Sequence, residues 1–175
     1  VDLVRTVTTD TEFSTTLTLP ETLSTAVVSK FGPWVVAATV HWTRWTRLDR
    51  VLVQFENATP EVHRYLGFQD AFLIGVGTRY RVNDRLVLST GVAGESATVD
   101  DDTRGAQNAD AGRLYITGGF SWKISERRTL DFSLGALRTR GASVNSYNEE
   151  SGNRITGTYA PLTLAWGGFR MQWRF

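Results

Sequence analysis

The C-terminal segment LAWGGFRMQWRF, residues 164–175, decides which fold class the sequence predicts. Its large apolar side chains occupy one parity and its small or polar ones the other: Phe169, Met171, Trp173 and Phe175 against Gly168, Arg170, Gln172 and Arg174. An extended strand of this sequence has one apolar and one polar face. A soluble protein rarely ends on such a strand, because fraying would expose its aromatics. In an outer-membrane β-barrel the apolar face meets lipid, so the segment favours a membrane barrel over an edge strand of a soluble sandwich.

Charge and composition exclude several functional classes. The chain has 19 Lys and Arg against 18 Asp and Glu, and a net charge of +1 gives no argument for a nucleic-acid partner. It has no cysteine, which excludes disulfides, thiol catalysis and cysteine-based zinc sites. The longest uncharged stretch, residues 155–169, has 15 residues and contains Pro161. A spanning helix needs about 18 apolar residues, so a membrane-spanning form must be a barrel.

Alternation of apolar and polar residues recurs along the chain and predicts about eight strands. They are expected within residues 13–19, 23–31, 34–55, 72–80, 86–92, 114–122, 130–136 and 164–175. Short turns are expected near residues 31–33, 82–84 and 125–127, and long polar loops at 56–69, 95–110 and 141–154. This rhythm is typical of outer-membrane barrels and places the short turns and the C-terminus on the periplasmic side.

Several motifs extend this interpretation. They are Leu17-Thr18-Leu19-Pro20-Glu21-Thr22-Leu23, Trp42-Thr43-Arg44-Trp45 within residues 34–47, Phe68-Gln69-Asp70-Ala71 leading into residues 74–80, the Asn83-Asp84 turn, and Gly91-Val92-Ala93. Together they resemble the C-terminal part of outer-membrane long-chain fatty-acid transporters, the FadL-like family. The resemblance implies part of a larger, fourteen-stranded barrel with an N-terminal plug in its lumen, and transport of hydrophobic molecules. The plug and the first strands have no counterpart here, so binding residues in that half cannot be carried over.

The N-terminal residues 1–10 do not resemble a signal peptide. Either a signal has been removed or the chain begins inside a larger protein. Whether the chain is a complete barrel or part of a larger one matters for function. A barrel of about eight strands has an interior filled by side chains or one small ligand, whereas a larger barrel leaves a lumen.

The polar parity defines the candidate substrate-contacting residues, because the face opposite the lipid points into the lumen. These residues are Thr39, His41, Arg79, Asp131, Arg170 and Gln172. Charges inside a barrel are costly unless they are paired or hydrated. In a narrow barrel, Arg79 and Arg170 are expected to pair with carboxylates such as Asp131. In a wide barrel they could contact a substrate carboxylate.

A second set of residues is expected at the membrane interfaces. The candidate interface aromatics are Trp34, Trp42, Tyr80, Trp122, Trp173 and Phe175. Arginines toward the outer strand ends either contact lipopolysaccharide phosphate or snorkel to the interface: Arg44, Arg47, Arg50, Arg138 and Arg140. The acidic run 100–102 is more simply a solvated loop than a calcium site.

No chemistry-bearing motif emerges from the sequence. His41 and His63 lack a carboxylate at ligand spacing, so no metal site is expected. Ser89, His41 and Asp131 share the inward parity, but such a trio arises by chance in a β-protein of this size. No hydrolase or phosphate-loop motif is present. We therefore expect no catalytic residue, no cofactor and no enzyme activity.

The sequence predicts one all-β domain over residues 1–175, an antiparallel transmembrane β-barrel or the C-terminal half of one, in the bacterial outer membrane. The expected function is passive uptake of hydrophobic compounds such as long-chain fatty acids. Expected partners are membrane lipids, lipopolysaccharide, a hydrophobic small-molecule ligand and, through the C-terminal strand, the barrel-assembly machinery. Alternatives are a small structural or adhesive barrel, a subunit of a larger membrane assembly, and a soluble barrel binding a lipophilic ligand, which would invert the facing of every strand.

Overall fold

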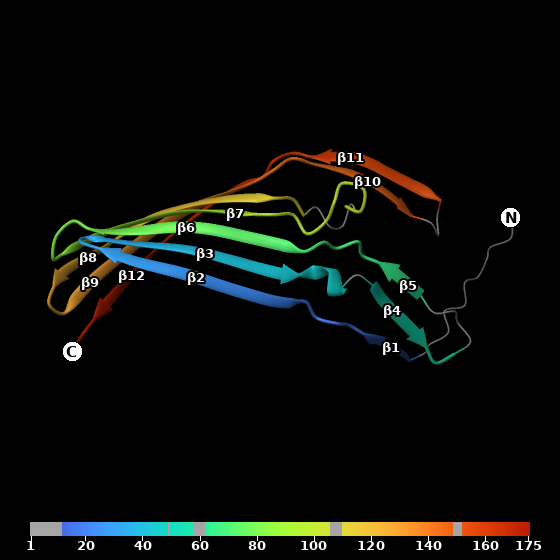
Figure 1. Cartoon of the computed structure of the whole chain (residues 1–175), viewed down its shortest axis with the longest axis horizontal. Coiled ribbons are helices and arrows are strands. Elements are labelled where there is room, and N and C mark those ends of the chain that lie inside the picture. Colours follow the sequence, from blue (N-terminus) through green and yellow to red (C-terminus); the bar gives the residue numbers. More distant parts are fainter. Residues whose placement is uncertain (1–11, 49, 58–61, 106–109, 149–151) are drawn as a thin grey trace, which may run out of the picture.

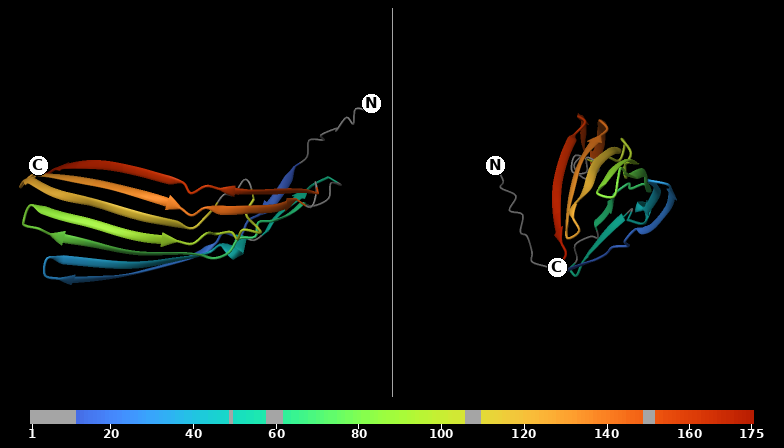
Figure 2. Two further views of the ribbon diagram at one scale, coloured as in Figure 1. Left: turned by 90° about the horizontal axis from the view of Figure 1, so that it is seen from above. Right: turned by 90° about the vertical axis from the view of Figure 1, so that its left-hand side faces the viewer.

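A computed structural model describes residues 12–48, 50–57, 62–105, 110–148 and 152–175; the N-terminal residues considered as a signal lie outside this part. Its main element is a curved antiparallel sheet of seven strands, which we call the wall, in the order β12-β9-β8-β7-β6-β3-β2 (Figures 1 and 2). Its strands are β2 (Glu21–Phe31), β3 (Trp34–Arg44), β6 (Ala71–Arg81), β7 (Leu86–Glu95), β8 (Arg113–Ser125), β9 (Arg128–Thr139) and β12 (Thr163–Trp173). Among the described residues the edge strands β2 and β12 are not paired with each other.

Short and long connections lie at opposite ends of the wall. The hairpins β2–β3, β6–β7 and β8–β9 turn tightly at residues 32–33, 82–85 and 126–127, and Gly32 supplies the positive φ of 56° in the first turn. These turns and the C-terminus gather at one end, on the left in Figure 1. We call this the turn end and the opposite end, which carries the long connections, the loop end. The predicted rhythm of short and long connections is confirmed.

The loop end contains more regular structure than the sequence indicated. The strands β1 (Phe13–Thr16), β4 (Arg50–Phe55) and β5 (Val62–Tyr65) form a small separate sheet, and β10 (Ala142–Asn148) pairs with β11 (Asn153–Tyr159) as a hairpin. The predicted strand at 34–55 is broken by the short 3₁₀ helix η1 (Trp45–Leu48). The predicted loops at 56–69 and 141–154 are wrong in part, because β5, β10 and β11 form by pairing with neighbouring strands and no apolar alternation in the sequence marks them.

Strand register aligns most of the large apolar residues of the wall strands on one face, the outer face. One aligned row comprises Val27, Ala38, Val76, Val92, Ile116, Ala136 and Ala165. A second row, toward the turn end, comprises Phe31, Trp34, Tyr80, Leu88, Phe120, Phe132 and Phe169. In the second row the ring centroids of Trp34 and Tyr80 lie 4.4 Å apart. Aromatic rows of this kind mark a membrane interface in barrels.

The apolar outer face is not covered by protein. Ile116 is 61% exposed, and the buried apolar residues among those described are Ala71, Val99, Ala111 and Val144. A soluble sandwich would bury its apolar strand faces in a dry core, which the described part of the wall does not do. The wall strands are 10 to 13 residues long, enough for a transmembrane β-strand of about 9–11 residues.

Two polar groups on the outer face are satisfied within the wall. The hydroxyl of Thr78 donates to the carbonyl of Val35 at 3.2 Å, and that of Thr90 donates to the carbonyl of Thr117 at 2.9 Å. Such bonds remove the cost of placing a hydroxyl in hydrocarbon. In the described part of the chain, no helix has both the length and the apolar character needed to cross a bilayer.

Candidate functional site: the inner face of the wall

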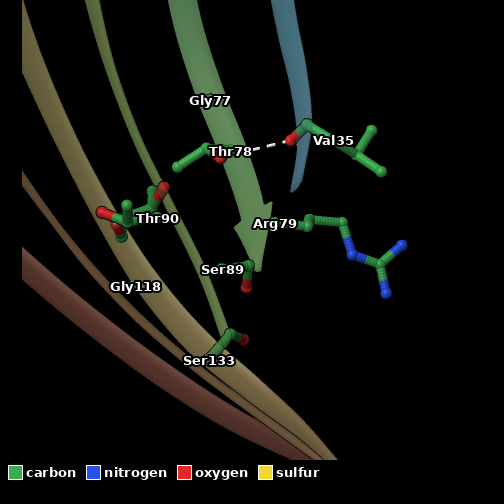
Figure 3. A pocket seen from close by; sticks show the side chains of 9 residues that line it. Val35, Gly77, Thr78, Arg79, Ser89, Thr90, Gly118 and Ser133 are labelled. Carbon is green, nitrogen blue, oxygen red and sulfur yellow. Dashed lines mark hydrogen bonds between the residues drawn. The ribbon is translucent and has the colours of Figure 1, made fainter. Parts of the chain in front are cut away.

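One row of residues on the inner face of the wall has small side chains. The row that runs from Val28 on β2 to Trp166 on β12 contains, between them, Ala37, Gly77, Gly91, Thr117 and Gly135. Two shallow depressions of about 260 and 210 Å³ lie in this region. In Figure 3, Arg79 and Val35 extend to one side of the sheet, whereas Thr78 and Thr90 extend to the other. Small inner side chains leave space beside the wall instead of filling it.

Apolar groups also line part of the inner face. The Trp166 indole packs flat against Gly135, where an added Cβ would lie 2.5 Å from the ring. Leu164 pairs with Leu137 in the neighbouring row on the same face. Leu164 and Trp166 are not among the lumen-facing residues predicted from the sequence. They share the even parity of Arg170 in the C-terminal segment, and this parity is the signal that indicates the inner face.

A polar cluster occupies the turn end of the inner face. Arg170 donates to Asp131 from Nε at 3.1 Å and from Nη2 at 2.9 Å, and Gln172 donates to the same carboxylate oxygen at 3.0 Å. The structure therefore brings three of the predicted residues together as an internally satisfied group. This arrangement ties β12 to β9 and leaves the Arg170 charge balanced.

Arg79 differs from Arg170. Its side chain is exposed, and no ion pair with it is found in the part of the chain that the structure describes. Lys30 lies in the same inner row, across Val35. This part of the inner face therefore presents two cations, Lys30 and Arg79. Arg79 is available to bind an anionic group of a ligand at the inner face.

The remaining predicted inner residues lie nearer the loop end. Thr39 donates to the Thr25 carbonyl at 3.1 Å. His41 is hydrogen-bonded to the hydroxyl of Ser24 through Nδ1 and to that of Thr43, at 3.1 Å, through Nε2. Both of its ring nitrogens therefore have hydroxyl partners.

The sequence-derived trio is not assembled as a catalytic group. His41 pairs with Leu73, whereas Ser89 pairs with Arg79, six residues further along β6. Asp131 lies still nearer the turn end, opposite Arg170. No group of three potential metal ligands gathers among the described residues.

The predicted interface aromatics lie on or beside the outer face. Trp34 and Tyr80 belong to the aromatic row at the turn end, Trp42 pairs with Leu23 and Phe72 at the loop end, and Trp122 and Trp173 follow the same outer parity. Phe175 follows β12 and is fully exposed. The set thus occurs at both ends of the apolar face, as in the two aromatic girdles of a membrane barrel.

Three of the sequence motifs meet at the loop end, in a cluster we call the junction. Glu21 forms ion pairs with Arg44, at 3.5 Å, and with Arg47. Asp70 accepts hydrogen bonds from Trp42 Nε1 at 3.1 Å, and from the hydroxyl and backbone nitrogen of Thr46 at 2.8 and 3.2 Å. These bonds turn the chain out of β3, which explains why the predicted long strand breaks.

Asp70 gives the junction a pH dependence. The Thr46 hydroxyl is the main group that holds the pKa of Asp70 below its ordinary value of 3.8, with Trp42 and the charge of Arg44 adding to it. The stabilisation is therefore complete above about pH 4 and is lost as pH falls through the lowered pKa. We expect Asp70→Asn to lower the unfolding temperature at pH 7 and the gap to the unsubstituted protein to narrow below pH 3.8. Circular dichroism melts at pH 7 and below pH 3.8 measure the difference in unfolding temperature between the two proteins. A difference that does not change with pH would refute the role of the Asp70 charge.

Residues 4–167 match the model of the family described as outer membrane protein transport protein (OMPP1/FadL/TodX). The chain belongs to this family. Its curated members include the long-chain fatty acid transport protein of Escherichia coli O6:H1, 24% identical over 145 residues, which cover 79% of this chain and 32% of that protein. Outer membrane protein P1 of Haemophilus influenzae is 25% identical over 127 residues, covering 70% of this chain and 27% of that protein.

Solved structures of the OMPP1/FadL/TodX family share the fold. A Pseudomonas aeruginosa FadL homologue matches with a TM-score of 0.72 at 19% identity, over 91% of this chain and 36% of the other. The P. putida toluene transporter TodX matches with a TM-score of 0.56 at 15% identity, over 89% and 35%. The chain thus spans about a third of the length of the curated relatives and structures it matches. It is an antiparallel strand assembly of an outer-membrane β-barrel family of Gram-negative bacteria that is described as a family of transport proteins.

Proposed function

We propose that the protein carrying this chain conducts hydrophobic compounds, long-chain fatty acids among them, passively across the outer membrane. The observation that carries the proposal is one row of the inner face, in which five small side chains lie between Val28 and Trp166. A barrel of about eight strands would fill its interior with side chains. The inner row between Val28 and Trp166 instead has no side chain larger than threonine, which supports a lumen wide enough for a ligand.

The chemistry of this face suits an amphipathic acid. Trp166, Leu137 and Leu164 give an alkyl chain an apolar surface, and Arg79 offers a cation to a carboxylate. Arg170 is less suited to that role because Asp131 and Gln172 already occupy its surroundings. No energy source is required, because the ligand moves down its concentration gradient.

Uptake of a fluorescent long-chain fatty acid by cells that lack their own transporter tests the proposal. We expect expression of the protein to raise uptake, Arg79→Gln to lower it by about tenfold at limiting substrate, and Arg79→Lys to retain most of it. Uptake of an uncharged alcohol of equal chain length should be unaffected by either substitution, because it has no carboxylate.

Two results would count against this function. Protein that inserts into the outer membrane without raising uptake would favour a structural barrel. Equal losses of acid and alcohol uptake in Arg79→Gln would show that the arginine supports the wall and does not bind the carboxylate. Heat-modifiable mobility in gels, a property of folded barrels, controls for insertion of each variant.

A further inference from the structure

A depression of about 1180 Å³ lies at the loop end of the wall, separate from the inner-face depressions. Part of its lining is a single row of outer-face residues, Ile74, Gly94, Leu114 and Arg138, paired across β6, β7, β8 and β9. The rest comes mainly from the β7–β8 connection, from residues 140–142 after β9, and from the inner-face row Glu95, Arg113 and Thr139 at the ends of β7, β8 and β9. The depression therefore lies at the rim of the wall, and one side of it is part of the surface that faces lipid.

Gly94 opens a slot within this row. A Cβ added at Gly94 would meet no atom within 4 Å, so the space beside it is empty. Its neighbours across the sheet, Ile74 and Leu114, are 58% and 57% exposed. The slot thus has apolar sides, and it opens onto the apolar outer face. An acyl chain lying on that face could enter the slot and contact its apolar sides.

Two arginines lie at the polar end of the depression. Arg138 belongs to the outer-face row, and Arg140 follows at the same parity, its backbone nitrogen bonded to the Gly112 carbonyl at 2.8 Å. Both side chains are exposed, and neither has an ion pair with another described residue. In contrast, Arg104 and Arg113, which line the same depression, are paired with Asp101 and Asp110.

We propose that this depression is a binding site for lipopolysaccharide, with an acyl chain in the Gly94 slot and a lipid A phosphate on Arg138 and Arg140. Lipopolysaccharide is the phosphorylated lipid of the leaflet that the loop end meets, and charge complementarity selects a phosphorylated head group. The Gly94 slot and both arginines lie on the outer-face parity, so the inference does not depend on what passes through the lumen.

The acidic run Asp100–Asp102 also lines the depression. This mixed charge disfavours a bare phosphate ion. It fits a lipid whose phosphates are bridged by divalent cations, because carboxylates can share those cations. A lipid with a single phosphate and two acyl chains would use fewer of these contacts.

Binding of rough lipopolysaccharide to the delipidated, detergent-solubilised protein in the presence of magnesium tests the site. We expect Arg138→Gln combined with Arg140→Gln to weaken binding about tenfold, and Gly94→Leu to weaken it about fivefold by filling the slot. Gly118→Leu is the matched control. Gly118 lies on the same outer face outside this depression, and the nearest atom to its added Cβ is 3.9 Å away.

The comparison ligands are phosphatidylglycerol and inorganic phosphate. We expect phosphatidylglycerol to bind at least about tenfold more weakly than lipopolysaccharide, and inorganic phosphate not to compete. Equal affinity for phosphatidylglycerol, or equal effects of Gly94→Leu and Gly118→Leu, would overturn the proposal. Unchanged binding by the double arginine variant would overturn it as well. If the double arginine variant does not fold in detergent, the comparison of Gly94→Leu with Gly118→Leu tests the lipopolysaccharide site by itself.

Discussion

The substitution Ile116→Arg is expected to lower the free energy of unfolding from a bilayer by about 2–4 kcal/mol. The substitution Thr117→Arg is expected to lower the same free energy by less than about 1 kcal/mol. Ile116 lies on the outer face, in the row midway between the aromatic residues Trp34 and Trp42 of β3. Its neighbour Thr117 points to the inner face. The two positions are adjacent in the chain and lie on opposite faces of the wall. The difference between their free-energy costs therefore shows which face of β8 meets lipid.

Denaturant titration of the protein folded in lipid vesicles measures both values. Ile116→Leu serves as a control, because it keeps an apolar side chain of the same size and should cost less than about 1.5 kcal/mol. Equal costs for the two arginines, or a larger cost at position 117, would mean that β8 does not present its even-numbered residues to lipid.

Arg104→Met is expected to open the β7–β8 connection, with a local cost of about 3 kcal/mol. Arg104 is 4% exposed. It donates to the carbonyls of Asp110 at 2.7 Å, Ser143 at 2.7 Å and Val99 at 3.1 Å, and it pairs with Asp101. Methionine fills similar volume but leaves these acceptors without a donor, and each buried unsatisfied group costs about 1–3 kcal/mol.

The effect of Arg104→Met should be local, because the wall strands do not depend on it. We expect the population of the open connection to rise about a hundredfold, measured as faster amide exchange and protease cleavage in residues 96–105. Arg127→Met, in the exposed turn after β8, is the control and should leave exchange in this segment unchanged. Equal exchange in the Arg104→Met variant and the unsubstituted protein would show that the buried guanidinium does not hold the connection.

Facing of the wall strands could be predicted because it follows directly from a period of two. Residues such as Val76, Ile116 and Phe132 lie on the parity that the sequence indicates, and register then aligns them across strands. The positions of the turns followed from residues such as Gly32 and Pro33, which favour tight connections. The cost of leaving a charge unpaired predicts, for a narrow barrel, that Arg79 and Arg170 both pair with carboxylates such as Asp131. Arg170 does so, whereas Arg79 has no ion pair with another described residue.

Features that depend on contacts distant in sequence could not be predicted. The break after β3 results from Asp70, which lies 24 residues beyond Thr46. Arg104 reaches Ser143 from a polar loop whose sequence shows no periodicity. The open space beside Gly94 depends on side chains of two neighbouring strands, so the sequence alone gives a glycine without its surroundings.

The apolar face of the wall meets lipid, and the opposite face does not. The chain has no cysteine, so single cysteines at positions 116 and 117 can carry a fluorophore without background labelling of the chain. In vesicles that contain brominated lipids, we expect strong quenching of the label at position 116 and weak quenching of the label at position 117. Weak quenching at 116 with strong quenching at 117, or equal quenching at both, would contradict this expectation.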